Sequence, residues 1–201
     1  MLVGRGPAPP PVQTPVFDSQ TLQSWQRSLA AVLCNPSKGD VAYIRHLGDS
    51  LLAAGDVYAA HACFLCANEA PRSAVDPHCR IALLGANHRS AGHDRLPLAI
   101  QLTEVLEYAK RLGGSTDVVP HFHYTKLMYA AWLAEVGELK HALAYCDTLA
   151  RDLRDASPAQ LAQYSLQYVV SLLALGERLR ARDMLAALQS NISDFWVNEV
   201  C

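Results

Sequence analysis

The stretch Leu51-Leu52-Ala53-Ala54-Gly55-Asp56 decides the fold of this chain, because its order of apolar, glycine and acidic positions recurs twice. The other copies are Leu133-Ala134-Glu135-Val136-Gly137-Glu138 and Leu172-Leu173-Ala174-Leu175-Gly176-Glu177. The glycine suits the left-handed conformation that ends a helix, and the acidic residue suits the N-terminus of the next helix. Each copy therefore predicts a helix–turn–helix hairpin.

Small and apolar residues stand at fixed distances after each glycine. Five residues on is an alanine, and apolar residues follow nine and twelve residues on. In chain order these positions hold Ala60, Phe64 and Ala67; Ala142, Cys146 and Leu149; and Ala181, Leu185 and Leu188. A small residue at a fixed place lets two helices lie close together. Such hairpins bury their faces only by stacking, so we predict an all-α fold, an α-solenoid of about eight main helices.

Composition excludes several classes of protein. The 201 residues are 51% hydrophobic, and 17 basic and 19 acidic residues leave a net charge of −2. No basic block marks a nucleic-acid surface, and the apolar runs are too short to span a membrane. No basic patch followed by an apolar region opens the chain, so we expect a cytosolic protein without a signal peptide.

The chain divides into a lead, a helical domain and one irregular segment. Residues 1–17 are rich in proline and predict a disordered linker, and residues 18–201 form the solenoid domain. Residues 70–96 hold Pro71, Pro77, Gly85 and Gly92 and predict an irregular connector with one helical turn at most. The expected helices are 20–33, capped by Asp18 or Ser19; 41–54; 57–68; one opened by Pro97 and ended by Gly113-Gly114; 120–136; 139–153; 158–175, capped by Ser157; and 179–192.

Cysteine and histidine spacing does not predict a metal site or a cofactor. Cys63 and Cys66 share one helical face, but His78, Cys79 and His88 downstream do not form a second pair of ligands. The six cysteines are expected to be small buried apolar residues: Cys34, Cys63, Cys66, Cys79, Cys146 and Cys201. His121 and His123 flank the start of a helix, where solvated or capping histidines are usual.

Residue patterns also do not predict an enzyme. No cysteine stands at a helix N-terminus beside a base, and Gly113-Gly114 lacks the Lys-Ser/Thr of a phosphate-binding loop. Glu104 and Glu107 are expected to be solvated. His61 is expected to be buried or half-buried and bonded to a neighbouring backbone group, and Asp49 to cap or pair with an adjacent hairpin.

Blocks of residues from 22 to 155 resemble a known family. In order they are Trp25 with Leu29-Ala30-Ala31-Val32-Leu33 and Asn35; Leu47-Gly48-Asp49 with Leu51 and Gly55; Ala59-Ala60-His61-Ala62-Cys63-Phe64-Leu65 with Ala67; Ile81-Ala82-Leu83-Leu84-Gly85 with His88; Ala99 to Ala109; and Lys126-Leu127-Met128-Tyr129-Ala130 with Leu133-Ala134, Gly137, Ala142, Leu143, Tyr145-Cys146 and Ala150. They are similar to the later half of the central conserved domain of the Sec-sixteen family. That family scaffolds COPII coat assembly at endoplasmic-reticulum exit sites. Its motif residues correspond here to Trp25, Gly48, Asp49, Gly55, Ala60, His61, Cys63, Gly85, His88, Glu104, Glu107, Tyr108, Lys126, Tyr129 and Gly137.

The resemblance implies a fold, a role and partners. The fold is the α-solenoid of the ancestral coatomer element, which the coat subunit Sec-thirty-one shares. The role is non-enzymatic scaffolding in ER-to-Golgi vesicle transport, on the cytoplasmic face of the endoplasmic reticulum. The partners are the coat subunits Sec-thirteen, a β-propeller bound through a strand-bearing segment of the intact parent domain, and Sec-twenty-three. No such segment precedes Trp25 here, so we expect a fragment of the larger domain.

Two further expectations concern binding. A fragment of a solenoid exposes apolar faces, so we expect self-association through the first helix, with Trp25, Leu29 and Leu33, or the last, with Leu185, Leu188 and Ile192. The alternative function is a tetratricopeptide-like hairpin module that binds a peptide in its concave groove. No nucleic acid and no membrane insertion are expected.

Overall fold

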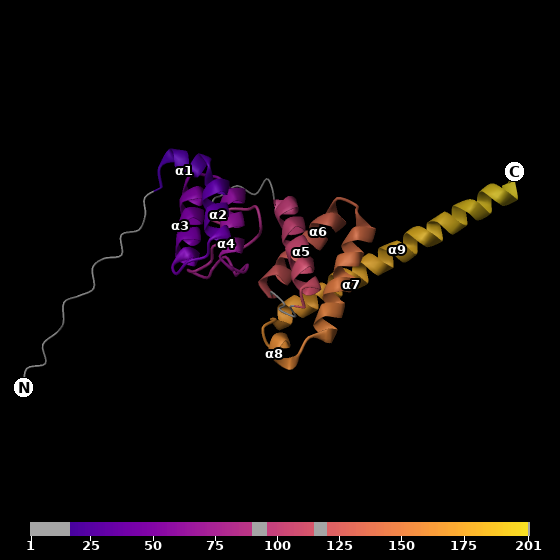
Figure 1. Ribbon diagram of the computed structural model, residues 1–201. Helices are drawn as coiled ribbons and strands as arrows, with labels where there is room; N and C mark the ends of the chain where they lie inside the picture. Colours follow the sequence, from indigo (N-terminus) through magenta and orange to yellow (C-terminus); the bar gives the residue numbers. More distant parts are fainter. Residues whose placement is uncertain (1–16, 90–95, 115–119, 201) are drawn as a thin grey trace, which may run out of the picture. The chain divides into compact units, whose positions relative to one another are not determined.

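The secondary structure of the described residues consists of α-helices. The computed structural model describes the backbone of residues 17–89, 96–114 and 120–200, and the side chains of these residues except 120 and 186–200. These residues contain no strand. Their helices are α1 (Ser19–Gln23), α2 (Trp25–Cys34), α3 (Asp40–Ala53), α4 (Val57–Cys66), α5 (Leu96–Leu112), α6 (Pro120–Glu135), α7 (Leu139–Asp155), α8 (Pro158–Leu161) and α9 (Leu166–Val200) (Figure 1). The predicted all-α fold of helical hairpins is confirmed.

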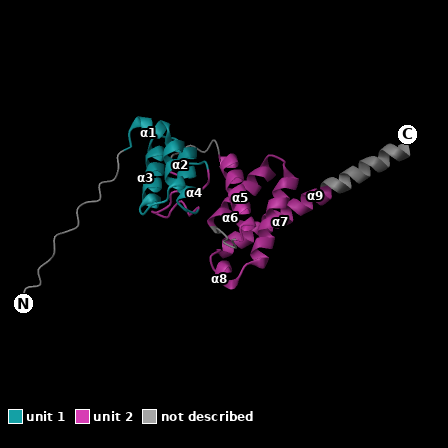
Figure 2. Cartoon of the chain, in the orientation of Figure 1, with its two compact units in different colours: residues 1–70, 85–87 teal, residues 71–84, 88–201 magenta. Residues whose placement is uncertain are grey.

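The chain forms two compact units (Figure 2). The first consists of residues 1–70 and 85–87 and contains α1 to α4. The second consists of residues 71–84 and 88–201 and contains α5 to α9. Each unit has a helical hairpin at its centre, α3–α4 in the first and α6–α7 in the second.

The hairpin of the first unit turns at Gly55, as predicted. Gly55 has a φ of 90°, and the side chain of Asp56 accepts a hydrogen bond of 3.0 Å from the amide of Ala59, which caps α4. Further along, α3 approaches α4 at Gly48. A Cβ atom on Gly48 would lie 2.5 Å from Cε1 of Phe64, and Phe64 is fully buried. The two helices therefore meet at a distance that only glycine allows.

The hairpin of the second unit turns at Gly137, where φ is 92°. Ala142 and Cys146 on α7 are buried, as the repeat predicts. They belong to a core that α6, α7 and α9 share: Ala130, Ala134, Ala142, Cys146, Leu149, Tyr168, Leu172, Leu175 and Leu179. Aromatic rings extend this core, since the ring centroids of Tyr124 and Tyr168 lie 4.6 Å apart.

The third predicted turn is wrong, because α9 runs through Gly176 as a helix. Leu175 and Leu179 explain the difference. They lie one helical turn apart and are both buried in the core that α9 shares with α7, so continuing the helix keeps both there. Ala181 and Leu185, which the repeat placed on a returning helix, are exposed.

Other helix boundaries differ in smaller ways. The first expected helix is divided at Ser24, whose hydroxyl donates to the carbonyl of Gln20. Asp18 caps α1 as predicted, by accepting from the amide of Thr21 at 2.8 Å. Ser157 begins α8 with a capping box, but the helix ends at Leu161 and α9 starts afterwards. Residues 70–89 contain no helix, as expected of the connector, and the lead 1–16 lies outside the described residues.

Two helical glycines test this account of the fold. Gly48→Ala should destabilise the protein by about 1–3 kcal/mol, because the new methyl group meets the buried ring of Phe64. Gly176→Ala is the matched change at a position with room for a methyl group, since the nearest atoms to its Cβ would lie at 3.7 and 3.8 Å, in ordinary van der Waals contact. It should stabilise the helix by about 0.5–1 kcal/mol. Chemical denaturation measures the stability of both variants. A large loss of stability in Gly176→Ala would support a turn at Gly176 in place of the continuous helix.

Candidate functional site

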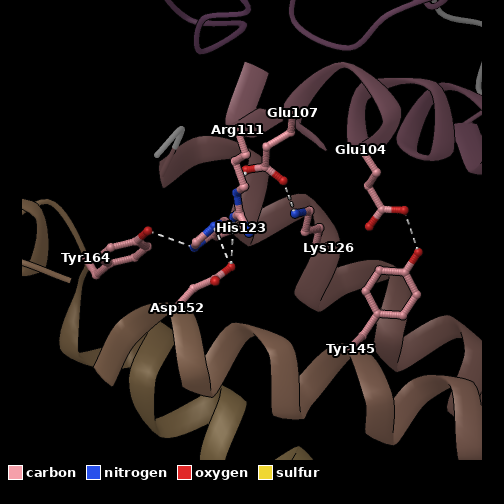
Figure 3. Close-up of polar contacts among 8 residues, drawn as sticks. All are labelled: Glu104, Glu107, Arg111, His123, Lys126, Tyr145, Asp152 and Tyr164. Atoms are coloured by element: carbon pink, nitrogen blue, oxygen red, sulfur yellow. Dashed lines mark hydrogen bonds and ion pairs between the residues drawn. The ribbon is translucent and has the colours of Figure 1, made fainter. Parts of the chain in front are cut away.

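Charged and polar side chains gather where α5, α6 and α7 meet in the second unit (Figure 3). Three helices and the segment before α9 contribute to this cluster, which we call the α5–α7 network. Its members are Glu104, Glu107, Arg111, His123, Lys126, Tyr145, Asp152 and Tyr164. Three of them, Glu104, Glu107 and Lys126, are residues singled out by the family resemblance.

A buried ion pair lies at the centre of the network. Nζ of Lys126 lies 2.5 Å from Oε2 of Glu107, and the two side chains are 6% and 11% exposed. The same ammonium group lies 4.6 Å from the ring centroid of Phe122, within the range of a cation–π contact. Arg111 approaches the other carboxylate oxygen of Glu107 at 3.7 Å. The ion pair joins α5 to α6 and leaves little of either charge to solvent.

His123 forms the second part of the network and is fully buried. Its Nδ1 lies 2.7 Å from the hydroxyl of Tyr164, and its Nε2 lies 3.6 Å from Oδ2 of Asp152. Burial, together with the positive charge of Lys126, lowers the pKa of His123 to about 4. Burial also raises the pKa of Tyr164 to about 12. Near neutral pH the imidazole is therefore uncharged, and the hydroxyl of Tyr164 keeps its proton within the hydrogen bond that joins the two side chains.

Asp152 and Glu104 connect α7 to α5. Arg111 approaches Asp152 at 3.4 Å. Tyr145 donates a hydrogen bond of 2.8 Å to Oε2 of Glu104. Burial raises the pKa of Glu104 and that of Tyr145. The prediction that Glu104 and Glu107 are solvated is therefore wrong, as is the prediction of a solvated or capping His123.

This arrangement stabilises the helix packing and does not provide a reactive group at the surface. The prediction of buried cysteines is wrong for Cys34 and Cys66, which are exposed. Burial raises the pKa of Cys63 and of Cys146 to about 11, so both are thiols at neutral pH. In the described ranges, no group of three or more His, Cys, Asp or Glu side chains is placed to hold a metal. Among the same residues, no helix has the length and hydrophobicity that a membrane span requires.

Several motif residues of the first unit serve its packing. Gly48, Ala60 and Cys63 are buried where α3 and α4 meet. His61 is 2% exposed, and the amide of Gly85 donates to its Nδ1 at 2.9 Å, which confirms the expected buried histidine bonded to backbone. Asp49 is half-buried on α3.

Other predicted residues are not members of the network. Trp25 is half-buried on α2, and Tyr108 is exposed on the outer face of α5. His88 is partly buried in the connector, where burial lowers its pKa. Tyr129 lies on α6 with its ring edge-on to Tyr145.

Expected self-association residues differ in exposure. Leu29 is buried within the first unit, so the predicted apolar face of the first helix is only partly exposed. Leu33 is 48% exposed and Leu185 is 59% exposed. Leu188 and Ile192 lie among the side chains outside the described residues.

Sequence reasoning missed three members of the network, Arg111, Asp152 and Tyr164. It named His123 and Tyr145 but did not predict their partners. Only one local signal pointed to any of them. Arg111 stands four residues after Glu107, a spacing that pairs opposite charges on a helix. Tyr145 and Tyr164 find their partners 41 residues away in the chain, which no periodic pattern indicates.

Comparisons with known proteins agree on one family. The family model described as the Sec16 Sec23-binding domain matches residues 7–200. "Protein transport protein SEC16B homolog" of Arabidopsis thaliana is 36% identical over 173 residues, which cover 85% of this chain and 12% of that protein. "COPII coat assembly protein SEC16" of Phaeosphaeria nodorum is 36% identical over 168 residues, covering 80% of this chain and 9% of that protein. "Protein transport protein Sec16B" of Oryctolagus cuniculus is 35% identical over 178 residues, which cover 86% of this chain and 16% of that protein.

These relatives are much longer than this chain, which spans between 9% and 16% of their lengths. No solved structure matches the chain.

Removing one partner of the central ion pair should destabilise the second unit. Lys126→Met leaves the carboxylate of Glu107 in a largely buried position, with a cost of about 3 kcal/mol. Adding Glu107→Gln should recover part of this loss, so the two changes together cost less than their sum. Lys140→Met is the matched control on the exposed surface of α7 and should change stability by less than about 0.5 kcal/mol. Additive losses in urea denaturation would mean that the two residues do not interact.

The lowered pKa of His123 makes stability depend on pH. Between its folded pKa of about 4 and the unfolded value of about 6.5, the unfolded chain binds the extra proton and the folded chain does not. The contribution of His123 to stability is therefore fully present above a pH of about 6.5. It falls as the pH drops toward 4, and the loss is about 2 kcal/mol at pH 5.

His123→Gln should remove that part of the pH dependence, whereas His141→Gln, a change at an exposed histidine, should not. Urea denaturation at pH 7 and pH 5 measures both variants. An unchanged pH dependence in His123→Gln would show that the imidazole is not held neutral by the network.

Proposed function

Because the chain belongs to the Sec16 (Sec-sixteen) family, we propose that it acts as a non-enzymatic scaffold module in COPII coat assembly. The match to the family model over residues 7–200 carries this proposal. Relatives named for COPII coat assembly and for protein transport support it. We place its action at endoplasmic-reticulum exit sites, on the cytoplasmic face, in ER-to-Golgi transport.

The ion pairs of the α5–α7 network support a scaffold role because they hold the helices of the second unit together. The charged groups of the α5–α7 network pair with one another, and Lys126 and Glu107 do so in a largely buried position, so these pairs fix the helices relative to one another. A scaffold needs a surface of constant shape, because a rigid surface loses little conformational entropy when a partner binds. The network therefore supports the presentation of the outer helix faces to coat subunits.

The outward face of α6 is the surface that we favour for a coat subunit. Met128 and Trp132 are spaced by four residues on α6 and are 43% and 38% exposed, and Val136, in the turn directly after α6, is 74% exposed. Aromatic and methionine side chains are enriched in the buried centres of protein interfaces. Sec23 is our first candidate partner, because the family model is described as Sec23-binding. Sec-thirteen and a second copy of the chain are further proposed partners.

The relatives' names favour this reading over the tetratricopeptide-like peptide-binding module. No contact of the described residues favours the peptide binder in particular, so it stays the alternative.

Binding to purified Sec23 tests the proposed function. The full chain should bind Sec23 with a dissociation constant of about micromolar, measured by titration calorimetry. Trp132→Ala should weaken this binding about tenfold or more, because it removes the largest side chain of the α6 face. Tyr58→Ala removes an exposed aromatic ring from α4 and is the matched control. No binding at roughly 100 µM would contradict the choice of Sec23, and equal effects of the two variants would contradict the choice of α6.

A further inference from the structure

Apolar side chains cover two opposite faces of α9. One face is buried in the core of the second unit and carries Tyr168, Leu172, Leu175 and Leu179. The opposite face carries Leu166, Val170 and Leu173, which are 80%, 50% and 57% exposed. A helix that is apolar on both faces is normally an internal helix, covered on both sides. The described part of the protein covers only one of them.

The exposed face continues along the helix as a regular stripe. Its positions are Leu166, Val170, Leu173, Glu177, Arg180 and Met184. They are separated by four and three residues in alternation, which is the spacing of a coiled-coil seam. All six are exposed, and from Arg180 to Leu185 every described side chain is exposed. The helix therefore projects beyond the core that holds its first half, and α9 extends past α7 in Figure 1. We call these six positions the α9 stripe.

The two charges in the α9 stripe indicate its partner. Glu177 and Arg180 stand next to each other in the seam and have opposite signs. If two copies of α9 pair in parallel, each charge faces its own like charge. If they pair antiparallel about a point between residues 178 and 179, Glu177 faces Arg180 of the other copy, and Leu173 faces Met184. The stripe is thus complementary to itself in one orientation only.

Neighbouring contacts hold the arginine at the edge of this seam. The guanidinium group of Arg180 pairs with Asp147 on α7, and both side chains stay about half exposed. Its Nη1 also lies 3.7 Å from the place that a Cβ on Gly176 would occupy. The pair with Asp147 therefore keeps the charge of Arg180 beside α7, at the edge of the stripe.

We propose that α9 is the self-association surface of this chain, through antiparallel pairing of the α9 stripe with the stripe of a second copy. This inference rests on the self-association included in the proposed function and names the surface and the orientation. The two pairs of Leu173 with Met184 supply apolar burial, and the pair of Glu177 with Arg180 of the second copy sets the register and excludes the parallel arrangement.

Charge reversal tests the pairing directly. Glu177→Arg and Arg180→Glu each place like charges opposite one another twice in the dimer, so each should weaken dimerisation about tenfold or more. An equimolar mixture of the two variants should associate again, because every pair in the mixed dimer then has opposite signs. Sedimentation of the full chain between roughly 1 and 100 µM measures all three samples and the unchanged protein.

Matched controls separate the seam from general effects of charge. Glu135→Arg and Arg178→Glu make the same changes at exposed positions outside the stripe and should leave dimerisation unchanged. Melting curves of each variant report any loss of stability from the contact between Arg180 and Asp147. A drop in melting temperature with restored association in the mixture would still support the pairing.

Three results would overturn the inference. If the unchanged chain stays monomeric at the highest concentration, the α9 stripe does not pair with a second copy. Variants that dimerise as the unchanged chain does would move the contact away from α9, as would a mixture that fails to associate. Binding of Sec23 by the Glu177→Arg variant, measured alongside, shows whether the proposed scaffold function survives when the pairing is lost.

Discussion

The close approach of two helices at Gly48 is the constraint on which the first unit depends. Phe64 fills the space that a side chain on Gly48 would take, and the carbonyl of Ala60 lies just beyond it. In the second unit, α6 and α7 pack closely through the small residues Ala130 and Ala142, which are both fully buried. Helices this close exclude water from the groups between them, so polar side chains there must find partners within the protein. The α5–α7 network meets that requirement in the second unit, and it leaves the outer faces of α6 and α9 for recognition.

The sequence predicts the hairpins where a local signal decides the structure. Gly55 and Gly137 adopt positive φ angles, and the small residues after them are buried. The same six-residue pattern around Gly176 fails, because the outcome there depends on packing between distant segments. Leu175 and Leu179 both face a core that α7 completes, and a turn would remove one of them from it. A repeat pattern describes only the local preference, and tertiary contacts override it here.

The site was less predictable than the fold. Resemblance to the family singles out Glu107 and Lys126, but the spacing of the chain does not show that they pair across two helices. Composition alone favours solvated carboxylates, since most acidic residues are exposed. His123 and Tyr164 lie 41 residues apart, and their contact exists only because α6 and the segment before α9 meet at the end of the unit. Contacts of this kind follow from the packing of the helices and cannot be read from a single segment.

Amide hydrogen exchange, followed by mass spectrometry of the full chain, tests the central claim most directly. That claim is that two tightly closed hairpins, α3–α4 and α6–α7, carry the stability of the protein. The account predicts the slowest exchange in peptides that contain Gly48, Ala60 and Ala142, and faster exchange in the connector between residues 71 and 82. Exchange in α3 and α4 as fast as in the connector would contradict it, because helices in such close contact must open together before their amides exchange.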